Sequence, residues 1–156
     1  MRCAMLLAAF AITFGFLAPA GAQTPSGAPE VNPKFLAFLK PVEIRAGEGE
    51  LQKKLKERHN VAAKLLEERV NEYRKGVRDL NSVFEAARLV VDAKLDLAEG
   101  RQARAAVLEQ ALDISKLVES HLEEQIKKGF GSKSELERAR LARLNMEIEL
   151  LRARGM

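Results

Sequence analysis

The hydrophobic residues of this chain follow a helical spacing from about residue 49 to the end, a stretch that contains no proline. Apolar side chains there recur at steps of three, four or seven residues, which places them on one face of an α-helix. The pattern predicts helices at about 49–75, 80–98, 102–128 and 133–151. Their predicted apolar faces contain Leu51, Leu55, Ala62, Leu66, Val70 and Tyr73 in the first, Leu80, Phe84, Ala87, Val91, Leu95 and Ala98 in the second, Leu108, Ala111, Val118, Leu122 and Ile126 in the third, and Leu141, Leu144, Ile148 and Leu151 in the fourth.

The turn after the first helix occurs again after the third, 53 positions later. The first helix ends at Tyr73-Arg74-Lys75-Gly76 and the third at Ile126-Lys127-Lys128-Gly129. In each turn, basic residues suit the negative end of the helix dipole, and the glycine can adopt the left-handed conformation that closes a helix. Residues 49–153 are therefore predicted to form an all-α domain of antiparallel helical hairpins, a four-helix fold made of one duplicated αα-hairpin.

Polar residues that follow each turn are predicted to cap the next helix. Asp79 is a suitable N-cap for the second helix, because its carboxylate can accept a hydrogen bond from a free backbone N–H group. Ser132 and Glu135 have the spacing of a capping box for the fourth helix. The sequence thus marks the beginning of both returning helices.

Gly100 leaves two architectures open, because one glycine inside a helix costs only about 1 kcal/mol relative to alanine. If the helix breaks there, the domain has four antiparallel helices, and both glycine turns lie at the same end. If it continues, the domain has three helices, and a long continuous central helix separates the two turns. The duplication favours the break, since it requires equivalent halves, and helices near fifty residues are rare in compact domains.

The residues before the helical domain form two segments of different composition. Residues 1–22 have the features of a secretion signal: a basic start, an apolar run from Met5 to Ala18, and small residues before Gln23. Residues 23–48 contain four prolines and are predicted to form an extended linker. A small apolar cluster within this linker is predicted to latch over the end of the bundle or, as the alternative, to contact a partner. The cluster consists of Phe35, Leu36, Phe38 and Leu39.

The remaining composition argues against several kinds of chemistry. Basic residues exceed acidic ones, 26 against 22, but no basic stripe is interleaved with aromatic residues, so no nucleic-acid partner is expected. The one cysteine, Cys3, lies in the predicted signal, which leaves the mature chain without a thiol. His59 and His121 lie among charged neighbours and are expected to be surface residues rather than metal ligands. No nucleophile has an identifiable base partner, so we expect no enzymatic activity and no cofactor, and no small-molecule substrate is identified.

Both hairpins carry a shared pattern of a glycine turn, a polar cap and a leucine- and alanine-rich helix. The first copy carries it at Tyr73, Gly76, Asp79, Leu80, Val83, Glu85, Ala86, Leu95 and Ala98, and the second at Gly129, Ser132, Leu136, Ala139, Ile148 and Leu150. This pattern resembles the hairpins of the TolC family of outer-membrane efflux proteins, which have Tyr-x-x-Gly, a polar turn and then Leu-x-x-x-Leu-x-Ala. The resemblance covers about residues 50–153, and Ile126 stands where the family's tyrosine is usual.

The resemblance implies a non-enzymatic component of an envelope export or efflux assembly, located in the periplasm or at the outer membrane. In that family the turns form a periplasmic tip that contacts the hairpin of an adaptor protein. The implied tip residues are Tyr73, Gly76, Val77, Arg78 and Asp79, followed by Gly129, Phe130, Gly131 and Ser132.

This chain also departs from the family, because full-length members insert β-strands between their hairpins. No alternating strand pattern occurs here, so the chain cannot form the family's pore alone, and we expect it to associate with membranes only through protein partners. Those partners would be an envelope adaptor or further copies of the chain itself. The alternative function is a free-standing periplasmic helical module that binds client proteins in the manner of a chaperone.

Overall fold

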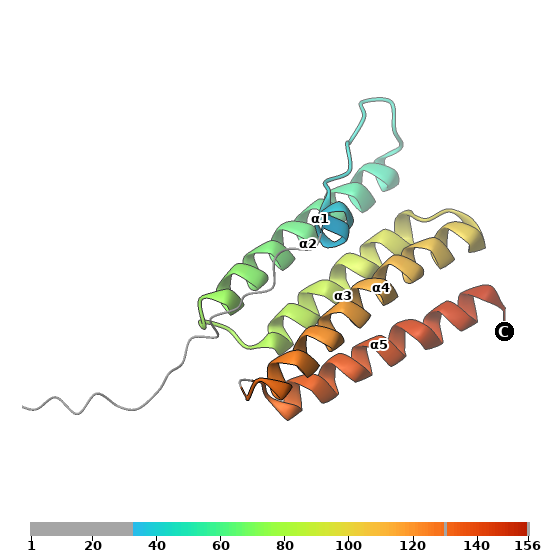
Figure 1. The fold of residues 1–156 in the computed structure, drawn as a ribbon. Helices are drawn as coiled ribbons and strands as arrows, with labels where there is room; N and C mark the ends of the chain where they lie inside the picture. The colour runs from blue at the N-terminus through green and yellow to red at the C-terminus, as the bar shows by residue number, and fades with distance from the viewer. Residues whose placement is uncertain (1–32, 130, 156) are drawn as a thin grey trace, which may run out of the picture.

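The computed structural model describes residues 33–129 and 131–155, which form helices and no strands (Figure 1). This confirms the predicted all-α fold. The predicted signal, residues 1–22, lies outside the described residues, as do residues 23–32 of the predicted linker. The helices are α1 (Pro33–Leu39), α2 (Glu50–Arg74), α3 (Leu80–Leu97), α4 (Gly100–Lys127) and α5 (Lys133–Arg154).

The chain reverses direction between α3 and α4. Ala98 and Glu99 have extended backbone conformations, and Gly100 has a φ of +83°. A φ in this range favours glycine because it has no Cβ. The alternative with a long continuous central helix is therefore wrong: α2 to α5 are antiparallel, and the α2–α3 and α4–α5 turns lie at the same end (Figure 1). We call this end the tip.

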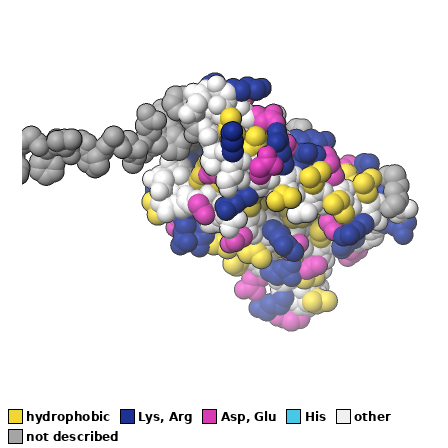
Figure 2. Space-filling view, turned by 90° about the horizontal axis from the view of Figure 1, so that it is seen from below, with side chains coloured by type: hydrophobic (Ala, Val, Ile, Leu, Met, Phe, Trp, Pro, Cys, Tyr) yellow, Lys and Arg dark blue, Asp and Glu magenta, His cyan; other side chains and the backbone are white. Residues whose placement is uncertain are grey.

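The helices pack as two hairpins. The most extensive contacts between helices join α2 to α3 and α4 to α5, whereas the two hairpins meet through smaller contacts of α3 with α4 and with α5. Seen from below, with α5 toward the viewer, the molecule exposes hydrophobic side chains among Lys, Arg, Asp and Glu side chains (Figure 2). The arrangement is thus an open array, with apolar groups left on one of its outer faces.

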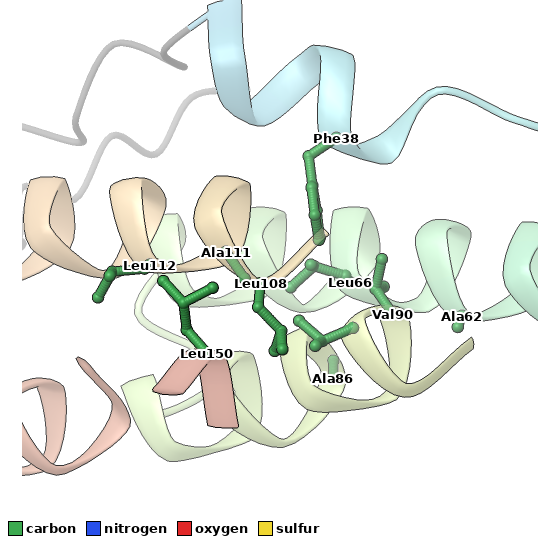
Figure 3. Close-up of a cluster of buried hydrophobic side chains, with 10 residues drawn as sticks. Phe38, Ala62, Leu66, Ala86, Val90, Leu108, Ala111, Leu112 and Leu150 are labelled. Carbon is green, nitrogen blue, oxygen red and sulfur yellow. The ribbon is translucent and has the colours of Figure 1, made fainter. Parts of the chain in front are cut away.

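The main core lies where the hairpins meet (Figure 3). Leu66 of α2 and Val90 of α3 are almost completely buried there. Burying a side chain of this size stabilises the fold by roughly 1.5–3 kcal/mol. The buried residues of this cluster are Phe38, Ala62, Leu66, Ala86, Val90, Val91, Leu108, Ala111, Leu112 and Leu150.

The predicted extended linker is wrong at residues 33–39, because this part of the chain forms α1, whereas residues 40–48 are not helical. Pro33 takes the first helical position, where its fixed φ fits and its missing N–H is not needed. Phe38 is buried in the main core, and the Lys94 ammonium lies 4.2 Å from the centre of its ring. The apolar cluster does latch onto the bundle, but α1 packs on α2 and α4 part-way along their length rather than over the end (Figure 1).

The segment between α1 and α2 is fixed by one side chain of α2. The Asn60 carboxamide accepts a hydrogen bond from the Val42 backbone N–H at 2.8 Å and donates one to the Val42 carbonyl oxygen at 3.0 Å. These paired bonds satisfy both backbone groups of Val42, as a neighbouring β-strand would. They hold the chain beside α2 after it leaves α1.

Candidate protein-binding surfaces

The first turn at the tip has the geometry predicted from its glycine. Gly76 has a φ of 69°, its N–H donates to the Tyr73 carbonyl oxygen at 2.9 Å, and the Val77 N–H donates to the Glu72 carbonyl oxygen at 2.9 Å. This pair of bonds is a Schellman motif, which satisfies carbonyl groups at a helix end. The turn leaves the side chain of Val77 69% exposed.

The second turn has the left-handed glycine and the shorter-range of these two bonds. Gly129 has a φ of 82°, and its N–H donates to the Ile126 carbonyl oxygen at 2.9 Å. Phe130, a predicted tip residue, lies outside the described residues. At Gly131 an added Cβ would come within 2.6 Å of Ile126 Cγ1, so glycine is required there by close packing rather than by a positive φ.

The caps of the two returning helices differ. Asp79 caps α3 as predicted, because its carboxylate accepts a hydrogen bond from the Ser82 N–H at 3.1 Å. Ser132 occupies the N-cap position of α5, but its side chain makes no capping hydrogen bond, so the predicted capping box is wrong. Glu135, the other member of that predicted box, instead lies close enough to Tyr73 and Asp79 to interact electrostatically with both.

These interactions connect the two turns at the tip. Burial raises the pKa of the Glu135 carboxyl, which is raised further by the Asp79 charge and lowered by Arg138. Burial and then the Glu135 charge raise the pKa of Tyr73.

A second core cluster lies beneath the tip. Tyr73 and Ile126 are the equivalent residues of the two turns, and both pack on this cluster. The buried members of this cluster are Leu80, Leu122, Leu136 and Ala139. Residues of both hairpins, Tyr73 and Asp79 from the first and Ile126 and Glu135 from the second, therefore lie together at the tip.

A groove of about 870 Å³ lies between the hairpins. Side chains of α3, α4 and α5 line most of it, and Phe35 and Phe38 of α1 contribute as well. Its apolar lining includes Phe84, Ala87, Val91, Leu95, Leu108, Ala111, Ile114, Leu141, Ala142 and Ile148, and its charged lining includes Glu85, Arg88, Asp92, Arg104, Arg138, Glu149 and Arg152. An apolar groove with charged edges is suited to an amphipathic helix or another apolar chain segment.

The apolar face predicted for α5 is not buried. Leu141, Leu144, Ile148 and Leu151 are all between 42% and 60% exposed. We call these four residues the α5 row. The buried residues of this helix are instead Leu136, Ala139 and Leu150.

Ion pairs between α4 and α5 explain why the α5 row faces outward. Arg143 Nε lies 2.6 Å from Glu119 Oε2, and Arg140 Nε lies 3.3 Å from Glu119 Oε1. Arg140 also pairs with Glu123 at 3.1 Å. These contacts hold Arg140 and Arg143 of α5 against α4, which leaves the α5 row exposed, with Leu141 and Ile148 at the edge of the groove.

His59 is fully buried, so its predicted place on the surface is wrong. Its Nδ1 lies 3.4 Å from Asn60 Oδ1, whereas Nε2 makes no hydrogen bond within the described part of the chain. Burial lowers the pKa of His59; the contact with Asn60 opposes this shift, and the positive charge of Lys94 adds to it. The folded protein therefore favours the neutral imidazole.

This burial predicts a loss of stability as the solution is acidified. The pKa of His59 is lower in the folded chain than its unfolded value of about 6.5, so the unfolded chain binds the proton more readily. The free energy of unfolding should then fall as the pH drops below about 6.5. Chemical denaturation at a series of pH values measures this, and His59→Gln should flatten the slope in that range.

His121→Gln provides the matched control for this prediction, since His121 lies in another helix and is only half-buried. It should leave the pH slope of the free energy of unfolding as in the unmodified chain. Equal slopes for the His59→Gln variant and the unmodified chain would contradict the predicted effect.

No protein-family model matches this chain, and no curated protein or solved structure matches it either. The similarity to the TolC family therefore stays a prediction from the hairpin residues. Within residues 33–129 and 131–155, no helix is long and apolar enough to span a membrane. The same residues contain no group of three or more His, Cys, Asp or Glu side chains placed to hold a metal ion.

Proposed function

We propose that this protein is a non-enzymatic, exported helical component of an envelope export or efflux assembly, and that it docks through its tip on a helical hairpin of an adaptor protein. The observation that carries this proposal is the position of both glycine turns at one end, joined by Tyr73, Asp79 and Glu135. The turns of both hairpins form this end of the molecule, and the helices hold their exposed side chains in place. Binding residues are often found on loops that a rigid scaffold positions in this way.

The chemistry of the tip supports a protein partner. Val77 is an exposed apolar side chain in the first turn, and Arg78 next to it lies 3.4 Å from Glu72. A partner helix could bury Val77 and meet the charges of Arg78 and Glu72 at the edge of the contact. Apolar centres with polar rims are typical of protein interfaces.

Site-specific photo-crosslinking in the producing cell tests this docking. A photoreactive residue at Val77 or Phe130 is expected to crosslink to an envelope adaptor, identified by mass spectrometry. A probe at Leu51 is the matched control, because Leu51 is 74% exposed but lies on α2 at the end away from the tip. Crosslinks that are absent from Val77 and Phe130, or equally frequent from Leu51, would contradict docking at the tip.

The groove favours a second candidate function, a free-standing module that holds client proteins. Its apolar lining could cover an exposed apolar segment of an unfolded chain. The purified protein would then suppress the aggregation of a model client, and Ala142→Glu in the groove would remove this effect. Leu117→Glu is the control, since Leu117 is exposed on α4 and is not among the residues that line the groove. Aggregation at the same rate with and without the protein would exclude this function.

A further inference from the structure

The α5 row is an apolar surface that the described chain leaves 42–60% exposed, and two of its members, Leu141 and Ile148, also line the edge of the groove. Its four large side chains lie three and four residues apart, so they form one stripe on the helix. Exposed hydrophobic side chains bordered by charged ones are visible on the face that α5 presents in Figure 2. Surfaces of this kind commonly mark sites of protein association.

The internal duplication indicates what covers a face of this type. α5 occupies the place in the second hairpin that α3 occupies in the first, and Leu144 and Ile148 correspond to Val91 and Leu95. Val91 is 7% exposed and belongs to a core cluster that includes Leu108 of the second hairpin. Val91 is therefore covered by helices of the same chain, whereas Arg88, the counterpart of Leu141, is exposed. Leu144 and Ile148, the α5 counterparts of Val91 and Leu95, are instead 42% and 45% exposed.

The charges beside the α5 row are arranged to complement themselves in an antiparallel pair. Glu137 and Arg138 lie toward the beginning of α5, and Glu149 and Arg152 toward its end. Each end thus offers one acidic and one basic group. In the single chain, Glu137 pairs with Arg140 at 3.0 Å, and Glu149 pairs with Arg152 at 2.6 Å. Both pairs lie within α5. Exposed pairs of this kind are weak and can exchange partners at little cost.

We infer that a second copy of this chain covers the α5 row, with the two α5 helices antiparallel about a twofold axis that passes near Leu144. Leu141 of one copy then lies opposite Ile148 of the second copy, because the two residues are about equally far from the axis. By the same symmetry, Glu137 lies opposite Arg152, and Arg138 lies near Glu149. Every contact occurs twice, as in any isologous interface.

This inference goes beyond docking at the tip, because it concerns another face and another partner. The α5 row begins more than one turn after the start of α5, and the tip residues are left uncovered. In the antiparallel arrangement the two tips point in opposite directions. The dimer would therefore present one docking end on each side.

Sedimentation equilibrium over a range of concentrations tests the pairing, using the protein as the cell produces it, with its N-terminus determined by mass spectrometry. The unmodified protein is expected to form a dimer. Leu144→Glu should raise the dissociation constant of the dimer at least about tenfold, because dimerisation would then bury a glutamate charge near the twofold axis. The matched control is Leu117→Glu on α4, because Leu117 is 43% exposed and Leu144 is 42% exposed. This control should dimerise as the unmodified protein does, and thermal melts establish that both variants are folded.

Charge reversal tests the antiparallel orientation. Glu137→Arg and Arg152→Glu should each weaken the homodimer, because like charges then face each other across the axis. An equimolar mixture of the two variants should recover a heterodimer of near-original affinity, since each pair of facing charges is again opposite in sign. A mixture that stays as weak as its components would overturn the antiparallel arrangement.

Three further results would overturn the inference: an unmodified protein that is monomeric at every concentration, an assembly larger than a dimer, or a dimer unaffected by Leu144→Glu. These outcomes can be separated from failure of the proposed function. A monomer that still crosslinks to an adaptor from Val77 retains tip docking and loses only the dimer. A dimer without that crosslink retains only the pairing.

Discussion

Replacement of Leu66 by alanine is expected to lower the free energy of unfolding by about 2–5 kcal/mol. Leu66 is 1% exposed and belongs to the cluster where α2 meets the rest of the molecule. Phe38 of α1, Val90 of α3 and Leu108 of α4 are members of the same cluster. The loss includes the transfer free energy of the removed atoms and the cost of the cavity that remains, because surrounding helices relax only in part.

Urea denaturation followed by circular dichroism measures this change. Val61→Ala on the same helix is the control, because Val61 is 64% exposed and its truncation should have little effect. If Leu66→Ala and Val61→Ala had similar free energies of unfolding, the described core would not be the main source of stability. A large loss for Leu66→Ala alone would locate that stability at the junction of the hairpins.

Gly129→Val is expected to destabilise the fold by about 1–3 kcal/mol. The cause is backbone strain rather than crowding: Gly129 has a φ of +82°, and no heavy atom lies within 4 Å of the position of an added Cβ. A β-branched side chain disfavours the left-handed conformation strongly. The helix end must then either remain strained or lose the bond from the Gly129 N–H to the Ile126 carbonyl oxygen.

Two controls isolate the backbone effect in thermal melts. Gly47→Val introduces the same side chain at a glycine that also has open space around it but lacks a left-handed φ. Glu124→Gln changes an exposed residue of α4 near the turn. Both variants should melt close to the unmodified protein. A melting temperature of Gly129→Val equal to that of Gly47→Val would show that the turn does not require glycine.

The helix ends were predictable from sequence because the signals that set them are local. Gly76 and Gly129 end helices through their own backbone conformation, and Asp79 caps α3 through a bond to a residue three positions away. The break at Gly100 has a weaker local signal, since glycine alone does not end a helix. The duplication supplies the stronger signal for this break, because it requires two equivalent halves.

The buried face of α5 was not predictable in the same way, because its side chains alone do not decide it. The helix has leucines on more than one side, and long-range ion pairs of Arg140 and Arg143 with α4 select the side that faces inward. These pairs join residues about twenty positions apart in sequence. The outward α5 row therefore depends on tertiary contacts that a periodicity cannot show.

The position of His59 could have been recognised from the spacing. It falls between Leu55 and Ala62 on the apolar face of the first helix, at steps of four and three residues. Its charged neighbours in sequence favour a surface position instead, so the two signals conflict. The helix α1 was harder to foresee, because prolines surround it on both sides and its stability comes from packing of Phe38 in the core.

Most contacts between helices lie within one hairpin or the other, and this affects how the chain folds. α2 with α3 and α4 with α5 are neighbours in sequence, so most inter-helix contacts close short loops and the contact order is low. Chains of this topology fold quickly, and each hairpin can form before the two meet. The later step, burial of the junction around Leu66, then unites two preformed units.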